Sequence, residues 1–310
     1  MEYTHKPVLL NECLDGLMIR PDGIYLDGTL GRAGHSREIV KRLTTGHLIA
    51  IDRDKAALDA APARLEGCMD KVTLVRGNFG DLKSILCALN VNGVDGMLFD
   101  LGVSSPQIDD GSRGFSYLQD APLDMRMDQS APLTARDVVN GWSQEELKRI
   151  LWQYGEERYS GLIAAAIVRE REQAEIKTTG QLAELIRMAM PAKARREKQH
   201  PAKRSFQAIR IAVNDELGEV ERMLNDALDA LNTGGRLAVI SFHSLEDRLV
   251  KNAYAQWAKG CTCPPDFPVC VCGKKPKVRL VGKRPITADS SELDENPRAR
   301  SAKLRVAERL

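Results

Sequence analysis

The chain has 310 residues, of which 43% are hydrophobic and 28% are charged, so it can form one large or two ordinary domains with a buried core. Its 45 Lys and Arg residues against 43 Asp and Glu residues give a net charge of +2, which excludes a uniformly basic histone-like protein and a strongly acidic disordered one. No apolar run approaches the roughly 18 residues of a membrane span, no signal peptide is recognisable, and the seven cysteines are an odd number, so we expect a cytoplasmic protein.

Short apolar strands alternate with helices through the first hundred residues. We predict strands at 24–27, 47–52, 71–77 and 94–102, and helices at 37–43, 55–65 and 82–89. Near-continuous apolar strands separated by helices are typical of a parallel sheet that is covered on both faces. The predicted fold class is therefore α/β.

A long helical insertion follows the fourth strand. The next convincing strand is 236–242, and 135 residues (101 to 235) precede it, whereas a crossover needs only about 30. A capping box at 143–146 opens one helix within this stretch, and the segment 178–181 opens another. We predict a discontinuous sheet domain, 1–106 with 214–310, and an inserted helical domain, 107–213.

The chain is predicted to return to the sheet after the insertion. A helix at 215–231 precedes Gly234 and Gly235, which stop it before the strand at 236–242. The tail, 296–310, alternates apolar and basic residues and is predicted to form a final strand at a sheet edge.

A glycine-rich loop after the first strand is a candidate cofactor site. Gly28, Gly31 and Gly34 permit a tight turn and a close backbone approach to a ligand at the start of a helix. Asp52 ends the second strand, where its carboxylate can accept hydrogen bonds from both hydroxyls of a ribose. The glycine spacing differs from the G-x-G-x-x-G of dinucleotide binders and favours S-adenosylmethionine; a turn without a ligand is the alternative.

Two more residues stand at the same predicted edge of the sheet. Phe79 follows the third strand and is a candidate to pack on adenine, with ordinary core packing as the alternative. Asp100 ends the fourth strand, at the edge where open α/β proteins bind ligands, with a turn or helix cap as the alternative.

The segment Ser104-Ser105-Pro106-Gln107 is the candidate catalytic loop. It incompletely resembles the [S/D/N]-P-P-[aromatic] loop of amino-methyltransferases, which holds a weakly nucleophilic exocyclic amine in line with the methyl donor. Such a base must leave its stack to reach the donor. Gln107 replaces the aromatic residue, so Phe115 and Tyr117 become candidates to stack on the base. A plain Ser-Pro turn is the alternative.

A set of motifs across nearly the whole chain resembles the ribosomal RNA small-subunit methyltransferase H family, also called MraW. The motifs are HKPVLLNE (5–12), GTLGRAGHS (28–36), DLGVSSPQ (100–107), RGFS (113–116), PLDMRMD (122–128), YGEER (154–158), KRSFQAIRIAVNDEL (203–217), SFHSLEDR (241–248) and NPRARSAKLR (296–305).

This resemblance implies a class I, Rossmann-like methyltransferase with an inserted helical domain. It implies S-adenosylmethionine-dependent N4-methylation of the cytosine at position 1402 in the decoding centre of 16S rRNA, within the small ribosomal subunit. It also implies cofactor contacts at Ala33, Gly34, His35, Asp52, Phe79, Asp100 and Gln107.

Four cysteines form a compact C-x-C-x₆-C-x-C pattern near the C-terminus: Cys261, Cys263, Cys270 and Cys272. Four thiolates can complete a tetrahedral zinc site, although the C-x-C spacing is tighter than the usual C-x₂₋₄-C. We therefore predict a small structural zinc site without a catalytic role. The alternative is four reduced thiols in a surface loop.

Positive charge is concentrated in two runs despite the near-neutral total. The first carries Arg187, Lys193, Arg195, Arg196, Lys198, Lys203, Arg204 and Arg210. The second carries Lys274, Lys275, Lys277, Arg279, Lys283 and Arg284. Such segregation predicts contact with RNA phosphates, with a solvated helix face as the alternative.

Two other functions stay open from the sequence. A nicotinamide-dependent oxidoreductase would bind NADH, although the glycine loop is irregular and a second nucleotide-binding half is missing. A non-catalytic RNA-binding ribosome assembly factor would bind the cofactor without methyl transfer. A hydrolase triad of Ser241, His243 and Asp247 is disfavoured, because 244–247 forms a simpler capping box after a strand. The sequence leaves monomer and homodimer open.

Overall fold

The computed structural model describes residues 7–197, 199–261, 263, 269 and 271–310. The chain divides into two compact units, Met1–Gly102 with Leu217–Leu310, and Val103–Glu216. The second unit begins four residues before the predicted insertion and ends three residues after it, so residues 103–106 and 214–216 belong to it rather than to the sheet unit.

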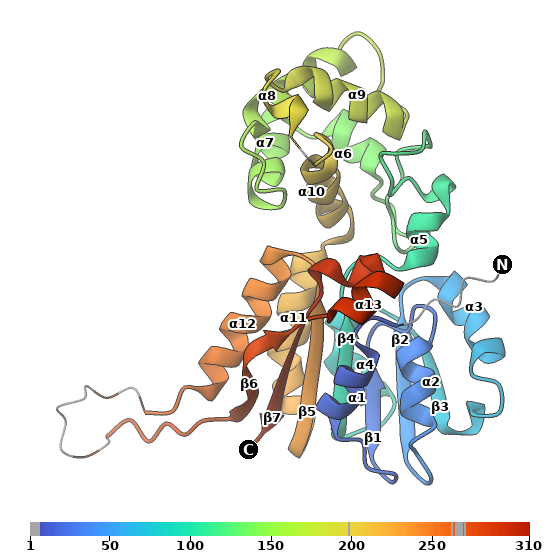
Figure 1. The fold of residues 1–310 in the computed structure, drawn as a ribbon, viewed down its shortest axis with the longest axis vertical. Coiled ribbons are helices and arrows are strands. Elements are labelled where there is room, and N and C mark those ends of the chain that lie inside the picture. Colours follow the sequence, from blue (N-terminus) through green and yellow to red (C-terminus); the bar gives the residue numbers. More distant parts are fainter. Residues whose placement is uncertain (1–6, 198, 262, 264–268, 270) are drawn as a thin grey trace. The chain divides into compact units, whose positions relative to one another are not determined.

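A seven-stranded sheet forms the centre of the first unit (Figure 1). Its strands are β1 (Ile24–Asp27), β2 (His47–Asp52), β3 (Val72–Arg76), β4 (Val94–Asp100), β5 (Leu231–Ser241), β6 (Val278–Ile286) and β7 (Lys303–Arg309). The order is β3-β2-β1-β4-β5-β7-β6; the first five strands are parallel to one another, and β7 is antiparallel to β5 and β6. The predicted α/β class is confirmed.

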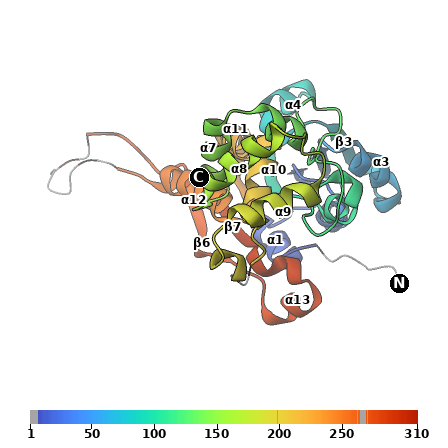
Figure 2. The ribbon, with the colours of Figure 1, turned by 90° about the horizontal axis from the view of Figure 1, so that it is seen from above.

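Helices cover both faces of this sheet because its strands are apolar on both sides. Tyr25 and Leu48 face one apolar cluster, whereas Leu26 and Ile49 face the other. The helices are α1 (Leu10–Leu17), α2 (Gly34–Val40), α3 (Lys55–Arg64), α4 (Leu82–Ala88), α11 (Glu216–Ala230), α12 (Ser244–Ala258) and α13 (Ser290–Glu295). Figure 2 shows α1 and α13 on one side and α4 and α11 on the other.

The far edge of the sheet differs from the prediction. The tail forms β7 as expected, but β7 is not an edge strand, because β6 pairs with its outer side. The sequence of β6 contains Gly282, Pro285 and three cations, so it lacks the apolar alternation of an ordinary strand. An edge strand tolerates proline and charge, because one side of its backbone has no partner strand.

The second unit is helical, as predicted. It contains α5 (Ser105–Asp109), α6 (Ala135–Gly141), α7 (Gln144–Gln153), α8 (Ser160–Arg171), α9 (Thr179–Ala189) and α10 (Lys203–Asn214), packed around their own apolar cluster. The predicted capping box that opens α7, Ser143 with Glu146, is confirmed, and Thr178 with Gln181 forms a second one at the start of α9. In the described part of the chain, no helix is both long and apolar enough to span a membrane.

Candidate functional site

Three aspartates end three adjacent parallel strands of the first unit. Asp27 ends β1, Asp52 ends β2 and Asp100 ends β4, and β1 lies between the other two in the sheet. Carboxyl ends of parallel strands meet at one edge, which is where open α/β folds bind their ligands. Asp52 and Asp100 are the residues predicted from the sequence, whereas Asp27 is not among them, although it occupies the same strand-end position.

The Asp52 carboxylate fastens the glycine loop to the end of β2. Its Oδ2 accepts a hydrogen bond from the Gly31 amide at 2.8 Å, and its Oδ1 accepts one from the Asp54 amide at 2.8 Å. Each carboxylate oxygen has a second lone pair, so both can still accept a ligand hydroxyl. Burial raises the pKa of Asp52, while the two amide bonds oppose that shift.

The glycine loop turns sharply before α2. Gly31 has φ 49° and Ala33 has φ 57°, so both lie in the left-handed region, which is costly for alanine. A Cβ on Gly34 would come within 2.4 Å of the Pro7 side chain, so only glycine fits there. His35 is buried, and its Nε2 is 3.0 Å from the Val8 carbonyl oxygen. The loop is therefore fixed from both sides.

Asp100 has one carboxylate oxygen without a partner among the described residues. Its Oδ1 is buried and unbonded, and its Oδ2 lies 3.8 Å from His35 Nδ1. Burial raises the pKa of Asp100 to about 6, with the neighbouring Asp27 adding to the shift and His35 opposing it. The side chain as a whole is 28% exposed, so a ligand can reach it. A buried acceptor without a donor is costly, and a cationic or N–H-bearing ligand would remove that cost.

Asp27 is fully bonded within the protein. It is 1% exposed, its Oδ2 accepts the Ser36 hydroxyl at 2.6 Å, and its Oδ1 accepts the Thr29 amide at 3.1 Å. Burial raises its pKa, whereas these hydrogen bonds lower it. Asp27 therefore holds the loop and α2 in place, while Asp52 and Asp100 keep acceptor capacity for a ligand.

Phe79 lies mainly in the core of the first unit. It is 8% exposed, and its ring meets Phe99 edge to face with centroids 5.7 Å apart. The Arg53 guanidinium lies 6.0 Å from the centre of the Phe79 ring. Core packing thus accounts for most of its surface, and its contact with adenine stays a prediction.

The candidate catalytic loop forms the start of α5 in the second unit. Ser105 and Gln107 are buried, and the Gln107 side-chain oxygen accepts the Ser104 amide at 3.0 Å. Pro106 stands in the first turn of the helix, where its missing N–H costs nothing. Gln107 is thus a helix-capping residue, while its predicted cofactor contact and the amine-holding role of Ser104, Ser105 and Pro106 stay predictions.

The two aromatic candidates for base stacking have partners in the second unit. Tyr117 stacks on His200 with ring centroids 4.5 Å apart, and it meets Phe206 edge to face at 5.6 Å. The Arg113 guanidinium lies 5.9 Å from the Phe115 ring centre. One face of Tyr117 is therefore already covered by a histidine.

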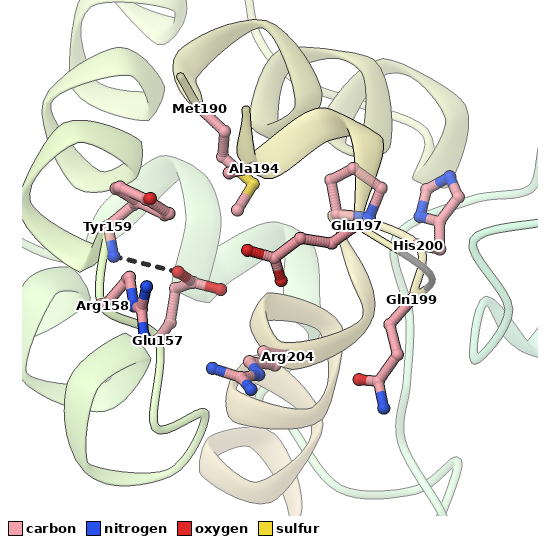
Figure 3. Close-up of a pocket in the computed structure, with 10 residues that line it drawn as sticks. Glu157, Arg158, Tyr159, Met190, Ala194, Glu197, Gln199, His200 and Arg204 are labelled. Carbon is pink, nitrogen blue, oxygen red and sulfur yellow. Dashed lines mark hydrogen bonds between the residues drawn. The ribbon is translucent and has the colours of Figure 1, made fainter. Parts of the chain in front are cut away.

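A cavity of about 390 Å³ lies in the second unit beside the start of α10 (Figure 3). The lining side chains include Arg158, Arg204 and His200, together with the acids Glu157 and Glu197. Glu157 is buried and accepts the Tyr159 amide at 2.9 Å, the dashed bond in Figure 3. Both arginines are exposed, and Arg204 Nη1 donates to the Glu156 carbonyl at 3.1 Å.

The first basic run has an unusual charge arrangement where α10 begins. Lys203 and Arg204 occupy the first turn, which contains no acidic residue and has no side-chain cap. Cations at the positive end of a helix dipole are unfavourable by a few tenths to about 1 kcal/mol, and an anion there is favourable. By contrast, Arg187 pairs with Glu184 and Arg210 with Glu216. Lys198 lies outside the described residues.

The second basic run continues into the edge strand β6. Its six cations are exposed, and Arg279 pairs with Glu308 at 2.8 Å. Charge on an edge strand also prevents pairing with another chain. The predicted role of this run in RNA contact therefore has a structural alternative.

The helix after β5 is capped differently from the prediction. The capping residue is His243, not Ser244, and the His243 amide donates a hydrogen bond to Glu246 Oε2 at 3.3 Å. The Asp247 carboxylate instead pairs with Arg305 and Lys303, and these cations lower its pKa although burial opposes them. His243 and Asp247 therefore have separate structural roles, and this arrangement argues against a hydrolase triad.

Comparison with known proteins identifies the family. A model described as the MraW methylase family matches residues 2–310. The chain belongs to this family. A relative from Brevibacillus brevis, "Ribosomal RNA small subunit methyltransferase H", is 57% identical and covers 100% of this chain and 99% of its own. A relative of the same name from Symbiobacterium thermophilum is 55% identical, and the match covers 100% of this chain and 98% of that relative.

In this MraW-family chain, we predict that Ser36→Ala lowers the stability of the first unit. The change removes the hydroxyl donor from a fully buried carboxylate and should cost about 1.5–3 kcal/mol. Urea unfolding at neutral pH measures it. Ser84→Ala, at an exposed serine of α4, is the matched control and should be nearly neutral. Equal effects of the two changes would contradict the role given to Asp27.

The cysteine group of this MraW-family chain is partly described. The sulfur atoms of Cys261, Cys263 and Cys272 lie within 4.8 Å of one another. Cys270 lies outside the described residues. Three of the four predicted zinc ligands are therefore close enough to share one metal ion, and the zinc site itself stays a prediction.

Proposed function

We propose that this protein transfers a methyl group from S-adenosylmethionine to the N4 amine of a cytosine in 16S rRNA of the small ribosomal subunit. Position 1402 in the decoding centre is the proposed target, as the family resemblance implies, and the cytoplasm is the proposed location. The observation that carries the proposal is the match over the whole chain to a methylase family whose relatives are named for this subunit's RNA.

The carboxyl edge of the sheet fits the proposed donor. S-adenosylmethionine supplies a methyl group on a sulfonium sulfur, and it carries a ribose diol and an ammonium group. Asp52 has lone pairs left for both ribose hydroxyls. Asp100 offers a buried oxygen that lacks a donor among the described residues, which suits the ammonium. The loop from Gly31 to His35 lies between these carboxylates and would cradle the methionine end.

The loop Ser104-Ser105-Pro106 is proposed to hold the cytosine amine. Ser104 follows Asp100 by four residues, so the covalent chain keeps their Cα atoms within at most about 14 Å. A hydroxyl or backbone carbonyl that accepts the N4 hydrogens directs the nitrogen lone pair toward the methyl carbon. The N4–CH₃ bond then forms as the S–CH₃ bond breaks, sulfur keeps the electron pair, and N4 releases a proton to water.

The start of α10 is proposed to contact an RNA phosphate. Two exposed cations stand at a helix N-terminus whose first turn lacks any acid, beside a cavity lined by Arg158 and His200 and also by the acids Glu157 and Glu197. A phosphate would be attracted both by these side chains and by the helix dipole. The neighbouring pairs Arg187–Glu184 and Arg210–Glu216 are internally neutralised, so they are weaker candidates.

The direct test of this function is methyl transfer to ribosomal particles. Purified protein and labelled S-adenosylmethionine are incubated with small subunits from cells that lack this methylation, with large subunits and with free 16S rRNA. We expect label in small-subunit RNA and none in large subunits. Donor binding without transfer to any particle would refute the enzymatic proposal and favour an assembly factor.

We predict that the double reversal Lys203→Glu with Arg204→Glu weakens RNA binding and flattens its salt dependence. Each lost phosphate contact should reduce the slope of log affinity against log salt by about 0.7–0.9. Filter binding at several salt concentrations measures this slope, and calorimetry checks that donor affinity is unchanged. The control reverses the exposed Lys55 and Lys83, with the same charge change. An unaltered slope would remove α10 from the RNA-binding surface.

A further inference from the structure

The loop between α12 and β6 is long, and its described residues form no apolar core. It spans 259–277, and none of its described residues is buried. Figure 1 shows its described flanks extending away from the sheet of the first unit. Loops longer than about 12–15 residues are uncommon in compact domains unless they have a function. Since its described residues make no buried apolar contacts, apolar packing among them does not hold this loop together.

The two arms of the loop meet at its base. The Lys277 amide donates a hydrogen bond to the Trp257 carbonyl at 2.8 Å. Further along, a Cβ on Gly260 would stand 3.2 Å from the Pro276 ring, so the arms remain adjacent. This arrangement brings the first and last cysteines of the loop toward each other.

Three sulfur atoms converge beyond this base. The Sγ atoms of Cys261 and Cys272 are 3.6 Å apart, and both lie within 4.8 Å of Cys263 Sγ. A disulfide would require about 2.05 Å. Around a tetrahedral zinc ion with Zn–S bonds of about 2.3 Å, neighbouring sulfurs are about 3.8 Å apart. The observed separation therefore fits shared coordination of a metal and not a disulfide between these two residues.

Backbone amides point at two of these sulfurs. The Cys263 amide donates to Cys261 Sγ at 3.4 Å, and the Val271 amide donates to Cys263 Sγ at 3.4 Å. A neutral thiol is a weak acceptor, whereas a thiolate is a strong one, and such hydrogen bonds orient metal-ligating groups. The exposed Lys259, Lys274 and Lys275 place positive charge along the same loop, which would partly offset a thiolate cluster.

We propose that this cysteine group binds one zinc ion, which clamps the α12–β6 loop and thereby fixes the start of the second basic run. Cys261, Cys263 and Cys272 supply three thiolates. Cys270 lies outside the described residues, but its C-x-C relation to Cys272 in the sequence makes it the expected fourth ligand. The ion is structural, because four protein thiolates would leave no open coordination position for substrate.

The test measures metal in the untagged full-length protein, produced with added zinc and purified without chelators. Elemental analysis should find about one zinc per chain. Cobalt(II) exchanged into the site should give the absorption bands of tetrahedral thiolate coordination. Chelation should expose thiols to a thiol reagent and make the 259–277 loop a protease target, without changing donor affinity. Failure here would leave the proposed methyl transfer intact.

Matched serine variants complete the test. Cys272→Ser and Cys263→Ser should each lose most of the zinc, whereas Cys87→Ser, at an exposed cysteine of α4, should retain it. Circular dichroism shows whether each variant is folded. Three results would overturn the proposal: wild-type protein that retains neither zinc nor cobalt, a Cys272→Ser variant with a full complement of zinc, or intact protein in which these cysteines form disulfides.

Discussion

Asp52→Ala should strongly weaken the affinity for S-adenosylmethionine while leaving the protein folded. The substitution removes both acceptors proposed for the ribose hydroxyls and releases the Gly31 amide from its carboxylate partner. Hydrogen bonds to a charged group contribute about 1.5–3 kcal/mol each. Losing two of them should weaken donor affinity by about 10²- to 10⁴-fold, as measured by calorimetry.

The control for this change is Asp59→Ala. Asp59 is an exposed carboxylate on α3 whose partner is Lys55, and it lies outside the carboxyl edge of the sheet. Its removal should leave donor affinity within about twofold of the parent, because exposed ion pairs contribute little. Asp52→Asn, which keeps one acceptor oxygen, should fall between the parent and Asp52→Ala. Parental affinity in Asp52→Ala would show that the ribose is held elsewhere.

Asp100→Asn should produce a more stable protein that binds its donor less well. Burial raises the pKa of Asp100 to about 6 from 3.8. At neutral pH the carboxylate is therefore ionised in the folded protein although burial disfavours its charge, and this destabilises the folded state. A difference of about 2 pKa units corresponds to a destabilisation of up to about 3 kcal/mol. For a unit of this size, each kcal/mol regained should raise the melting temperature by about 2–4 °C.

The pH dependence of Asp100→Asn has a defined sign. Because the folded pKa lies above the unfolded one, the folded wild type binds more protons between pH 4 and 6, and its stability falls as pH rises through that window. The stability gain of Asp100→Asn should therefore be full above about pH 6 and vanish near pH 4. Thermal melts at several pH values measure it, and a lower melting temperature at pH 8 would contradict the account.

Donor binding should show the opposite pH trend at the same residue. The Asp100 carboxylate attracts the donor ammonium only when it is ionised, so wild-type affinity should fall as the pH decreases through about 6. In Asp100→Asn, affinity should be about 10- to 100-fold weaker at neutral pH and should depend less on pH. A variant that gained stability and also kept its affinity would show that this carboxylate does not contact the donor.

Periodicity and strand ends made the sheet unit predictable from sequence. The strands that end at Asp27, Asp52 and Asp100 are continuous apolar runs, and burial on both faces leaves few alternative structures for them. Asp27 was missed as a loop-fixing residue because its hydrogen bond to Ser36 joins residues nine positions apart. An acid at the end of each of three parallel strands was the available signal.

Other features could not be predicted because they depend on tertiary contacts. The strand β6 carries Pro285 and several cations, and only its pairing with β7 makes it a strand. Gln107 caps α5. In the methyltransferase loop pattern it stands where an aromatic residue is expected, and that comparison does not predict a capping role. Tyr117 was a candidate for base stacking, but its stacking on His200 required the fold of the second unit to bring distant residues together.

Analysis of the methylated nucleoside tests the central claim most directly. After reaction of the purified protein with unmethylated small subunits, the RNA is digested and its modified nucleosides are identified and mapped by mass spectrometry. The account predicts N4-methylcytidine at a single decoding-centre position, and loss of that product with Asp52→Ala. Methyl transfer to a ring carbon or a ribose oxygen, or an undiminished product with Asp52→Ala, would contradict it.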